Sequence, residues 1–141
     1  MGKQQVRGPH QEGWTRKAGP YSNGVVTSGT RTVYLSGQVA RDATGTLVGQ
    51  GDIAAQFRQV MSNIIEIVQD AGGTADDIVH LVTYVCRGGE SADKPEPDYT
   101  VGSTVIEEVL SAPYPTHTLV EVRRMIDPDA LVETYAIAVL D

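Results

Sequence analysis

His117 is the residue of this sequence whose type and position best suit chemistry. It lies in the stretch Pro115-Thr116-His117-Thr118-Leu119, which predicts the beginning of a strand. Because side chains alternate between the two faces of a strand, His117 and Leu119 are expected on the same face as Glu121 and Arg123. An imidazole, with an ordinary pKa of about 6.5, can bind a ligand or exchange a proton near neutral pH. A structural histidine at a subunit interface is the alternative, and the sequence leaves both open.

The other residue types that could carry chemistry are scattered. The histidines at 10, 80 and 117 and the single Cys86 form no ligand cluster, so we expect no metal and no cofactor. No Gly-Lys-Ser/Thr motif follows the glycines at 24–51, which excludes a phosphate loop. Ser28 and Ser36 lack the strand-turn-helix motif of serine hydrolases. A lone cysteine permits no internal disulfide and favours a reducing, cytoplasmic location.

The chain is acidic, with a net charge of −7. Residues 1–17 hold four Lys and Arg against one Glu, a net charge of +3, so the remaining residues carry −10. Such a body repels phosphate backbones and contains no Lys/Arg stripe, which argues against nucleic acid as a partner. No apolar run is long enough to span a bilayer, so we expect no membrane partner.

Hydrophobic periodicity predicts an α+β fold with the element order ββαβαββ. The clearest element is a helix that begins after the capping residue Asp52, because apolar residues recur at helical spacing over 53–71. Gly72-Gly73 ends this helix. The other predicted elements are strands at 25–28, 32–39, 78–86, 118–124 and 131–140 and a second helix at 99–110.

This order predicts one domain over 18–141 after a flexible leader at 1–17. Both helices are expected to cover one face of a single mixed sheet, whose first two strands form a hairpin around 29–31. The polar loop at 87–98 is expected to be solvated, and it is also where substrate selectivity could be placed. The second sheet face keeps apolar side chains, which indicates a partner subunit.

Several short motifs occur in an order and at spacings that resemble a known family. They are Gly19-Pro20-Tyr21-Ser22, Ser36-Gly37-Gln38, Gly51-Asp52-Ile53, Val120-Glu121-Val122 and Ala136-Ile137-Ala138. Over roughly residues 18–141 the chain thereby resembles the RidA family, also called YjgF/YER057c/UK114. The resemblance implies a chorismate-mutase-like fold and a homotrimer around a barrel-like core, with three clefts between subunits. In the deaminase branch of that family, an arginine pairs with the carboxylate of a 2-imino acid, and water hydrolyses the C=N bond to release ammonia.

The resemblance places each cleft position on a residue of this chain. The family's tyrosine is retained as Tyr21, and its serine-glycine pair as Ser36 and Gly37, whose backbone can donate to a ligand. His117 stands where the family has its carboxylate-binding arginine, and Tyr135 where it has a glutamate that positions water. Leu119 stands at the family's frequent cysteine, and a looser correspondence puts Gly102 at an asparagine.

These replacements predict a divergent member of the family. Histidine offers two N–H donors only when protonated, so it does not reproduce the planar fork of arginine at neutral pH. We expect hydrolysis of an imine, enamine or related unsaturated amine other than 2-aminoacrylate. In this hypothesis Tyr21 and His117 orient the ligand, Ser36, Gly37 and Leu119 help to bind it, and Tyr135 places water.

Two alternatives remain at this point. Tyr135 could instead be an aromatic residue that packs across strands. The whole protein could be a non-catalytic binder of a small metabolite, because the replacements remove both the anion clamp and the carboxylate. A nuclease or an inhibitor of translation is disfavoured by the acidic body.

Overall fold

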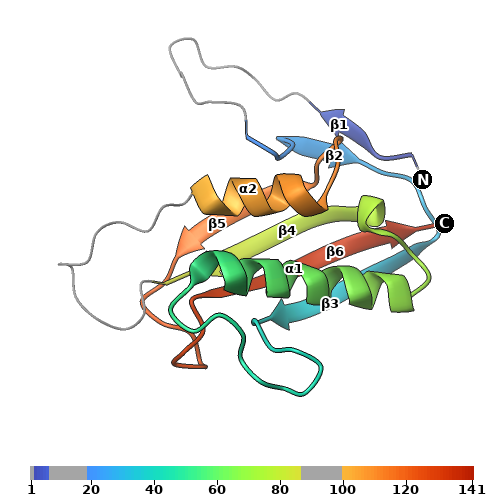
Figure 1. The fold of residues 1–141 in the computed structure, drawn as a ribbon. Helices are drawn as coiled ribbons and strands as arrows, with labels where there is room; N and C mark the ends of the chain where they lie inside the picture. Colours follow the sequence, from blue (N-terminus) through green and yellow to red (C-terminus); the bar gives the residue numbers. More distant parts are fainter. Residues whose placement is uncertain (1, 7–18, 87–99) are drawn as a thin grey trace, which may run out of the picture.

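The computed structural model describes residues 2–6, 19–86 and 100–141, which form a four-stranded sheet covered by two helices and a separate two-stranded sheet (Figure 1). The main helices are α1 (Ile53–Asp70) and α2 (Thr100–Val109), and the short 3-10 helix η1 (Ala75–Asp77) precedes the fourth strand. The strands are β1 (Gln4–Val6), β2 (Gly24–Val26), β3 (Arg31–Gln38), β4 (Ile78–Val85), β5 (Thr116–Glu121) and β6 (Val132–Leu140). Within these described ranges, no helix is long and apolar enough to cross a membrane.

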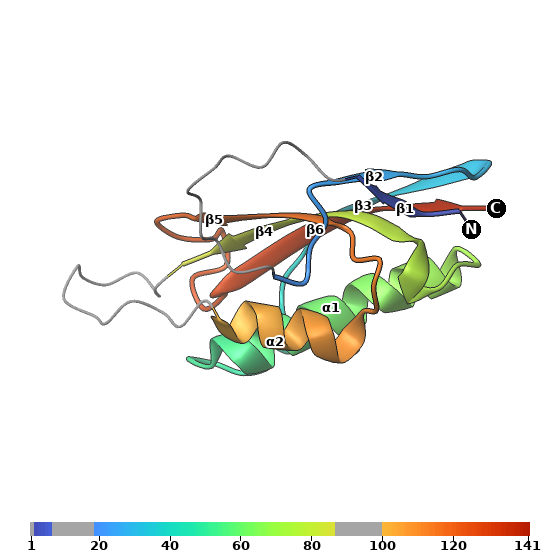
Figure 2. The ribbon, with the colours of Figure 1, turned by 90° about the horizontal axis from the view of Figure 1, so that it is seen from above.

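The main sheet has the strand order β3-β6-β4-β5. Its pairs β3–β6 and β6–β4 are antiparallel, whereas β4–β5 is parallel, so the sheet is mixed. Both helices lie on the same side of it (Figure 2). The predicted α+β fold, with two helices on one face of a mixed sheet, is confirmed. Strands β3 and β5 form opposite edges of this sheet, so residues of these two strands are far apart within one chain.

Helix α1 forms where its sequence predicts. The Asp52 side chain accepts a hydrogen bond from the backbone N–H of Ala55 at 3.0 Å, which satisfies one of the free donors of the first turn. The apolar face then buries Phe57, Val60 and Ile64 against the sheet. Gly72 follows the helix with φ of +92°, a backbone conformation that glycine adopts at little cost.

Strand β6 fixes the two faces of the sheet because its burial alternates without interruption. Residues 132, 134, 136, 138 and 140 are buried on the helix side, while 133, 135, 137 and 139 lie on the opposite, open face. A shift of the register by one residue would exchange these two sets, so burial of the helix side determines the face of each residue. Tyr135 therefore lies on the open face.

The predicted hairpin between residues 25–28 and 32–39 is wrong. Strand β2 pairs antiparallel with β1, with Gln4 opposite Val26, whereas β3 pairs with β6. The segment Gln4–Val6 lies within the expected leader at 1–17 and forms this strand. Lys3 supplies a physical reason, because its ammonium group donates a hydrogen bond to the carbonyl oxygen of Ile78 at 3.1 Å and ties the segment to the domain.

The other boundaries differ less. Strand β5 begins at Thr116, two residues earlier than predicted, and ends at Glu121, so Arg123 lies beyond the strand. Its early start follows from pairing with β4, in which His80 is opposite Thr116. The predicted polar loop at 87–98 and most of the leader lie outside the described residues.

A buried glutamine joins α1 to two loops. The Gln56 side-chain amide donates to the carbonyl oxygens of Gly49 at 3.1 Å and Asp129 at 3.0 Å, and its oxygen accepts from the N–H of Leu131 at 2.8 Å. Gln56 is fully buried, so these backbone groups have no water to replace it. The bonds hold the first turns of α1 beside the beginning of β6.

We predict that Gln56→Leu lowers the free energy of unfolding by about 3 kcal/mol, because it leaves buried backbone groups unsatisfied. Urea unfolding at one fixed protein concentration measures this change. Gln69→Leu is the matched control, because Gln69 is exposed on the same helix, and it should change stability by less than about 0.5 kcal/mol. Equal effects of the two substitutions would contradict a structural role for the Gln56 amide.

Candidate functional site

A cavity of about 350 Å³ lies between the two helices and the adjoining part of the sheet. Its volume is in the lower part of the range of small-molecule sites. Residues of α1, α2, β4, β5 and β6 line it, together with the segment that precedes β2. The lining residues are Pro20, Tyr21, Ile53, Phe57, Thr83, Val85, Gly102, Ser103, Ile106, His117, Thr118, Leu119 and Val132.

A chain of hydrogen bonds holds His117 in this cavity. Nε2 of His117 lies 2.8 Å from the hydroxyl of Thr83, which lies 2.8 Å from the hydroxyl of Thr134. The two threonines are buried, with exposed fractions of 1% and 0%. Since β6, β4 and β5 are neighbours in the sheet, the chain of bonds crosses three adjacent strands.

The direction of these bonds assigns the tautomer of His117. Each threonine hydroxyl has one proton to donate. Among the described residues, the side-chain partner of Thr134 is Thr83, so the Thr134 hydroxyl donates its proton to the Thr83 hydroxyl. Thr83 then donates to Nε2 of His117, which leaves the ring proton on Nδ1. The opposite direction would leave the buried hydroxyl proton of Thr134 without an acceptor.

The surroundings of His117 favour the neutral imidazole. Burial, together with charge repulsion from the nearby His80, lowers the pKa of His117 from its ordinary value of 6.5 to about 4. The ring stacks on Phe57, with centroids 6.5 Å apart and planes inclined by 29°. His117 is therefore uncharged at neutral pH, and it cannot serve as a cationic clamp there.

Ser22 places Tyr21 beside His117. Its backbone N–H donates to the carbonyl oxygen of Pro115 at 3.0 Å, and its hydroxyl donates to the carbonyl oxygen of Tyr114 at 2.5 Å. Ser22 also forms a parallel bridge with Thr116 at the outer edge of β5. These contacts seat the Gly-Pro-Tyr-Ser segment against β5, so that Tyr21 lines the same cavity as His117.

The predicted site residues divide into two groups in the structure. Tyr21, His117 and Leu119 line the cavity. Ser36 and Gly37 lie on β3, at the opposite edge of the sheet from β5.

Tyr135 is on the open face, where its ring lies 6.3 Å from that of His80 and 6.5 Å from that of Tyr84. It is opposite Val82 in the register of β6 with β4. A single chain therefore does not bring Ser36, Gly37 or Tyr135 to the cavity that holds His117.

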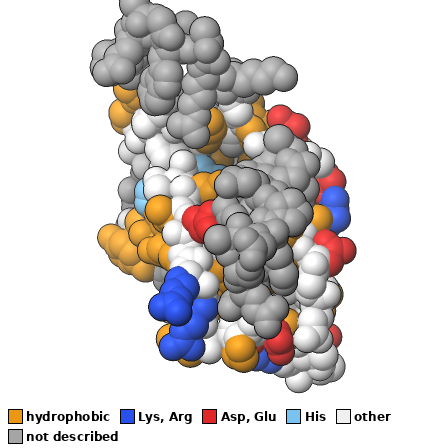
Figure 3. Space-filling model, turned by 90° about the vertical axis from the view of Figure 1, so that its left-hand side faces the viewer, with side chains coloured by type: hydrophobic (Ala, Val, Ile, Leu, Met, Phe, Trp, Pro, Cys, Tyr) orange, Lys and Arg blue, Asp and Glu red, His pale blue; other side chains and the backbone are white. Residues whose placement is uncertain are grey.

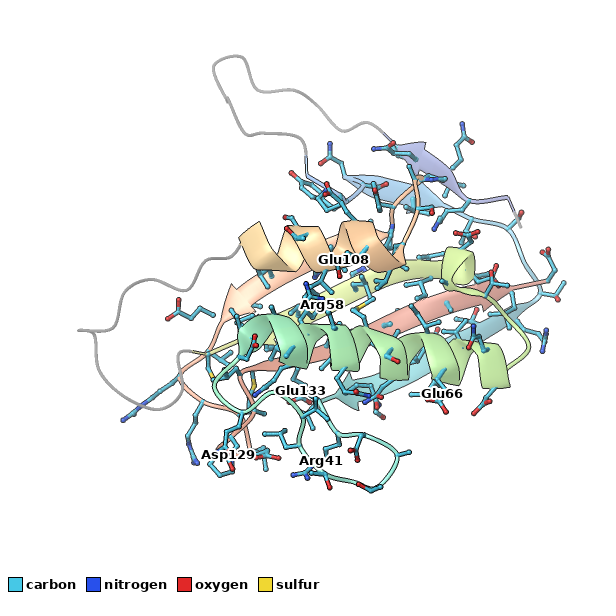
Figure 4. The ribbon with its side chains drawn as sticks, viewed as in Figure 1. Arg41, Arg58, Glu66, Glu108, Asp129 and Glu133 are labelled. Atoms are coloured by element: carbon cyan, nitrogen blue, oxygen red, sulfur yellow. The ribbon has the colours of Figure 1, made fainter. Side chains whose placement is uncertain are left out.

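An unpredicted carboxylate accompanies the second group. A Cβ atom at Gly37 would overlap the side-chain carboxylate of Glu133, so the glycine lets this carboxylate lie directly against the backbone of β3. Glu133 is labelled in Figure 4. It shares the open face with Tyr135, two residues further along β6.

Sequence reasoning missed the residues that orient His117. Thr83 and Thr134 lie in strands that otherwise present apolar side chains to the helices. A hydroxyl at such a position was the available signal, because a buried polar group requires a partner. Phe57 belongs to the apolar face of α1, and it additionally forms one wall of the cavity.

No charged side chain lines the cavity in the described part of the chain. Arg58 and Glu108 instead pair with each other across the two helices, at 2.9 and 3.1 Å (Figure 4). Arg123 and Arg124 are exposed and do not line it. In Figure 3 the Lys and Arg side chains gather apart from the pale-blue histidine surface, which borders hydrophobic side chains. Within the described ranges, no cluster of three or more His, Cys, Asp and Glu residues could hold a metal ion.

We predict that His117 makes folding stability fall as the pH falls from 6.5 to about 4. In that window the unfolded chain binds a proton at residue 117 that the folded chain does not, so acid favours unfolding, and the effect levels off below pH 4. The loss has a ceiling of about 3 kcal/mol, reduced by the partial exposure of the ring. The free energy of unfolding, measured by urea at each pH from 7 to 4, should depend less steeply on pH in His117→Gln than in the native protein. Equal slopes would contradict a neutral, buried imidazole.

Comparison with known proteins relates this site to a family. Residues 15–140 match the family model described as Endoribonuclease L-PSP. A RutC family protein of Pyrococcus abyssi is 31% identical over 121 residues, which cover 85% of this chain and 86% of that protein. A second RutC family protein, from Sulfurisphaera tokodaii, is 31% identical over 118 residues, which cover 84% and 86% of the two chains.

Solved structures agree with this relationship. The Rid family protein YyfB from Yersinia pestis superposes with a TM-score of 0.77 at 27% identity, covering 99% of this chain and 100% of that one. RidA from the Antarctic bacterium Psychrobacter superposes with a TM-score of 0.66 at 30% identity, covering 89% and 92%. The family resemblance inferred from the short motifs is confirmed: this chain belongs to the family of the RutC and Rid proteins.

Proposed function

We propose that this protein is a Rid-type hydrolase that deaminates a small imine, enamine or related unsaturated amine in clefts between the subunits of a homotrimer. The observation that carries the proposal is the cavity at the edge of the sheet, in which Tyr21 and His117 lie together against apolar walls. RidA from Psychrobacter and the RutC relatives support a Rid-type activity in general. The substrate and the cleft are inferred from the residues of this chain.

The reaction consumes one water and releases ammonia. The oxygen of water forms a bond to the imine carbon, while the π electrons of the C=N bond move to nitrogen, which takes up a proton. The hydroxyl proton of the carbinolamine then moves to nitrogen, and ammonia leaves as the C–N bond breaks and the carbonyl forms. The protein would contribute orientation and hydrogen bonds to these steps. An enamine reaches the same path after a proton moves to its carbon and converts it to the imine.

His117 and Tyr21 would orient the ligand in this scheme. The neutral imidazole presents Nδ1–H, which can donate to an imine nitrogen or a carbonyl oxygen. The Tyr21 hydroxyl can donate or accept one hydrogen bond. Because Nε2 is engaged by Thr83, the imidazole ring is fixed before the ligand arrives, which lowers the entropic cost of alignment.

The second half of the cleft would come from a neighbouring subunit. Gly37, Glu133 and Tyr135 lie together on the open face of the sheet, away from the cavity of their own chain. This face also exposes apolar area, including 78% of Tyr34 and 43% of Val120. Contact with further copies of the chain would bury that area. Around a three-fold axis it would also bring the open face of one subunit to the cavity of the next.

The acidic charge of residues 18–141 argues against RNA as the substrate, although the matching family model is described as an endoribonuclease. Nucleic acid binding depends on Lys and Arg contacts to phosphates, and the described cavity lining contains neither.

We predict that His117→Ala lowers kcat/KM for ammonia release by at least about 10-fold, because one oriented hydrogen-bond donor is lost. The comparison uses whichever imine the native protein hydrolyses. Imines are generated in situ by an oxidase, and ammonia is measured with and without the protein. His117→Arg should shift activity toward 2-imino acids, because arginine binds a carboxylate through two parallel bonds. Unchanged rates in His117→Ala would contradict the proposed role.

A specific observation supports the non-catalytic alternative, namely that the described cavity lining has neither a carboxylate nor a cation. In that case a ligand binds saturably, and no imine in the panel is hydrolysed faster than in buffer. Steady product formation by the native protein excludes this alternative.

We predict that inactive subunits complement each other across the interface. His117→Ala and Tyr135→Ala, each expected to lower activity strongly when alone, should recover about one quarter of native activity when co-assembled in equal amounts, because one cleft in four then combines two intact halves. The matched control pairs His117→Ala with Tyr21→Ala, whose changes lie in the same half and should not complement. A mass near three times 15.1 kDa in sedimentation is expected. Equal recovery in both mixtures, or a monomeric mass, would overturn the interface cleft.

A further inference from the structure

We infer that the cavity selects a ligand without a carboxylate, with an apolar body and one uncharged hydrogen-bonding group, so that the imine or enamine derives from an amine and not from an amino acid. The assignment of an imine rests on the proposed function. The ligand class rests on the cavity itself. Three features of its lining support this inference.

The first feature is the composition of the walls. Most of the lining side chains are apolar, and the polar groups among them are the imidazole of His117 and the hydroxyls of Tyr21, Thr83 and Ser103. No cation lines the cavity in the part of the chain that the structure describes. A carboxylate that enters an apolar site without a cation loses its hydration and gains no ion pair, so its binding is disfavoured.

The second feature is the hydrogen-bond chain behind His117. For the imidazole to become a cation, Nε2 would have to donate to Thr83 instead of accepting from it. Thr83 would then donate to Thr134, whose own proton would lose its acceptor in the buried core. The two threonines thus oppose the charged state by geometry. The lowered pKa of His117, about 4, agrees with this arrangement.

The third feature is the neutralisation of the nearest helix cation. Arg58 lies on α1, one residue after the cavity-lining Phe57, but both of its bonds go to Glu108 on α2. This pair lies on the surface and leaves no net charge for a ligand carboxylate. The remaining groups suit a planar, uncharged ligand, whose flat face can lie against Phe57 and whose nitrogen or oxygen accepts from Nδ1–H of His117.

The test compares ligands that differ only in the carboxylate. Binding to the full-length native protein is measured by calorimetry at pH 7.5 for phenylacetamide and for phenylacetate, which share their ring and size. We expect phenylacetamide to bind at least about 10-fold more tightly. His117→Arg should reverse this preference by supplying a cation, whereas the matched control Arg58→Gln should preserve it. Tighter binding of phenylacetate by the native protein, or binding of neither probe, would overturn the inference.

A parallel measurement separates the ligand class from the reaction. Ammonia release is followed from the imine of phenethylamine, made by an amine oxidase, and from that of phenylalanine, made by an amino-acid oxidase. Acceleration of the first alone supports both the ligand class and the proposed function. Acceleration of the second alone overturns the inference and leaves the hydrolase proposal intact. Selective binding of phenylacetamide without acceleration of either supports the ligand class and contradicts the hydrolase.

Discussion

The hydrogen-bond chain from Thr134 through Thr83 to His117 is the constraint on which the candidate site depends. It crosses the three adjacent strands β6, β4 and β5 on their helix-covered face. Because both threonines are buried, their protons have one satisfactory arrangement, and that arrangement makes Nε2 of His117 an acceptor. The protonation state of the site is thus set by the interior of the sheet. Phe57 and the cavity walls add to it by desolvating the ring.

The scaffold around the cavity is held by contacts that do not involve His117. Asp52 caps α1, Gln56 joins it to the segment before β6, and Ser22 seats Tyr21 against β5. The chemistry of the cavity depends instead on its polarity. A neutral imidazole in an apolar wall favours hydrogen bonding to an uncharged group, whereas an arginine would favour a carboxylate. The fold by itself therefore does not determine the chemistry of the cavity.

The faces of the sheet impose the second constraint. Because side chains alternate strictly along β6, Thr134 lies on the helix-covered face, where it bonds to Thr83, and the adjacent Tyr135 lies on the open face. Side chains that follow each other in sequence thereby serve different surfaces. The cavity and the open face carry complementary parts of the predicted site, which accounts for the proposal that neighbouring subunits complete it. The same face exposes the apolar area of Tyr34 and Val120 that such an assembly would cover.

The sequence by itself determined the helices, the strands of the main sheet and the family, because capping residues, hydrophobic periodicity and ordered motifs are local signals. It also singled out His117, whose type and strand position are visible without coordinates. The partner of β2 was not predictable, since pairing with Gln4–Val6 depends on contacts distant in sequence, such as that of Lys3 with Ile78. Only the tertiary structure decided that His117 is neutral and that Tyr135 lies on the other face. Both properties arise from strand register and burial, which bring residues such as Thr83 and Thr134 together from separate parts of the chain.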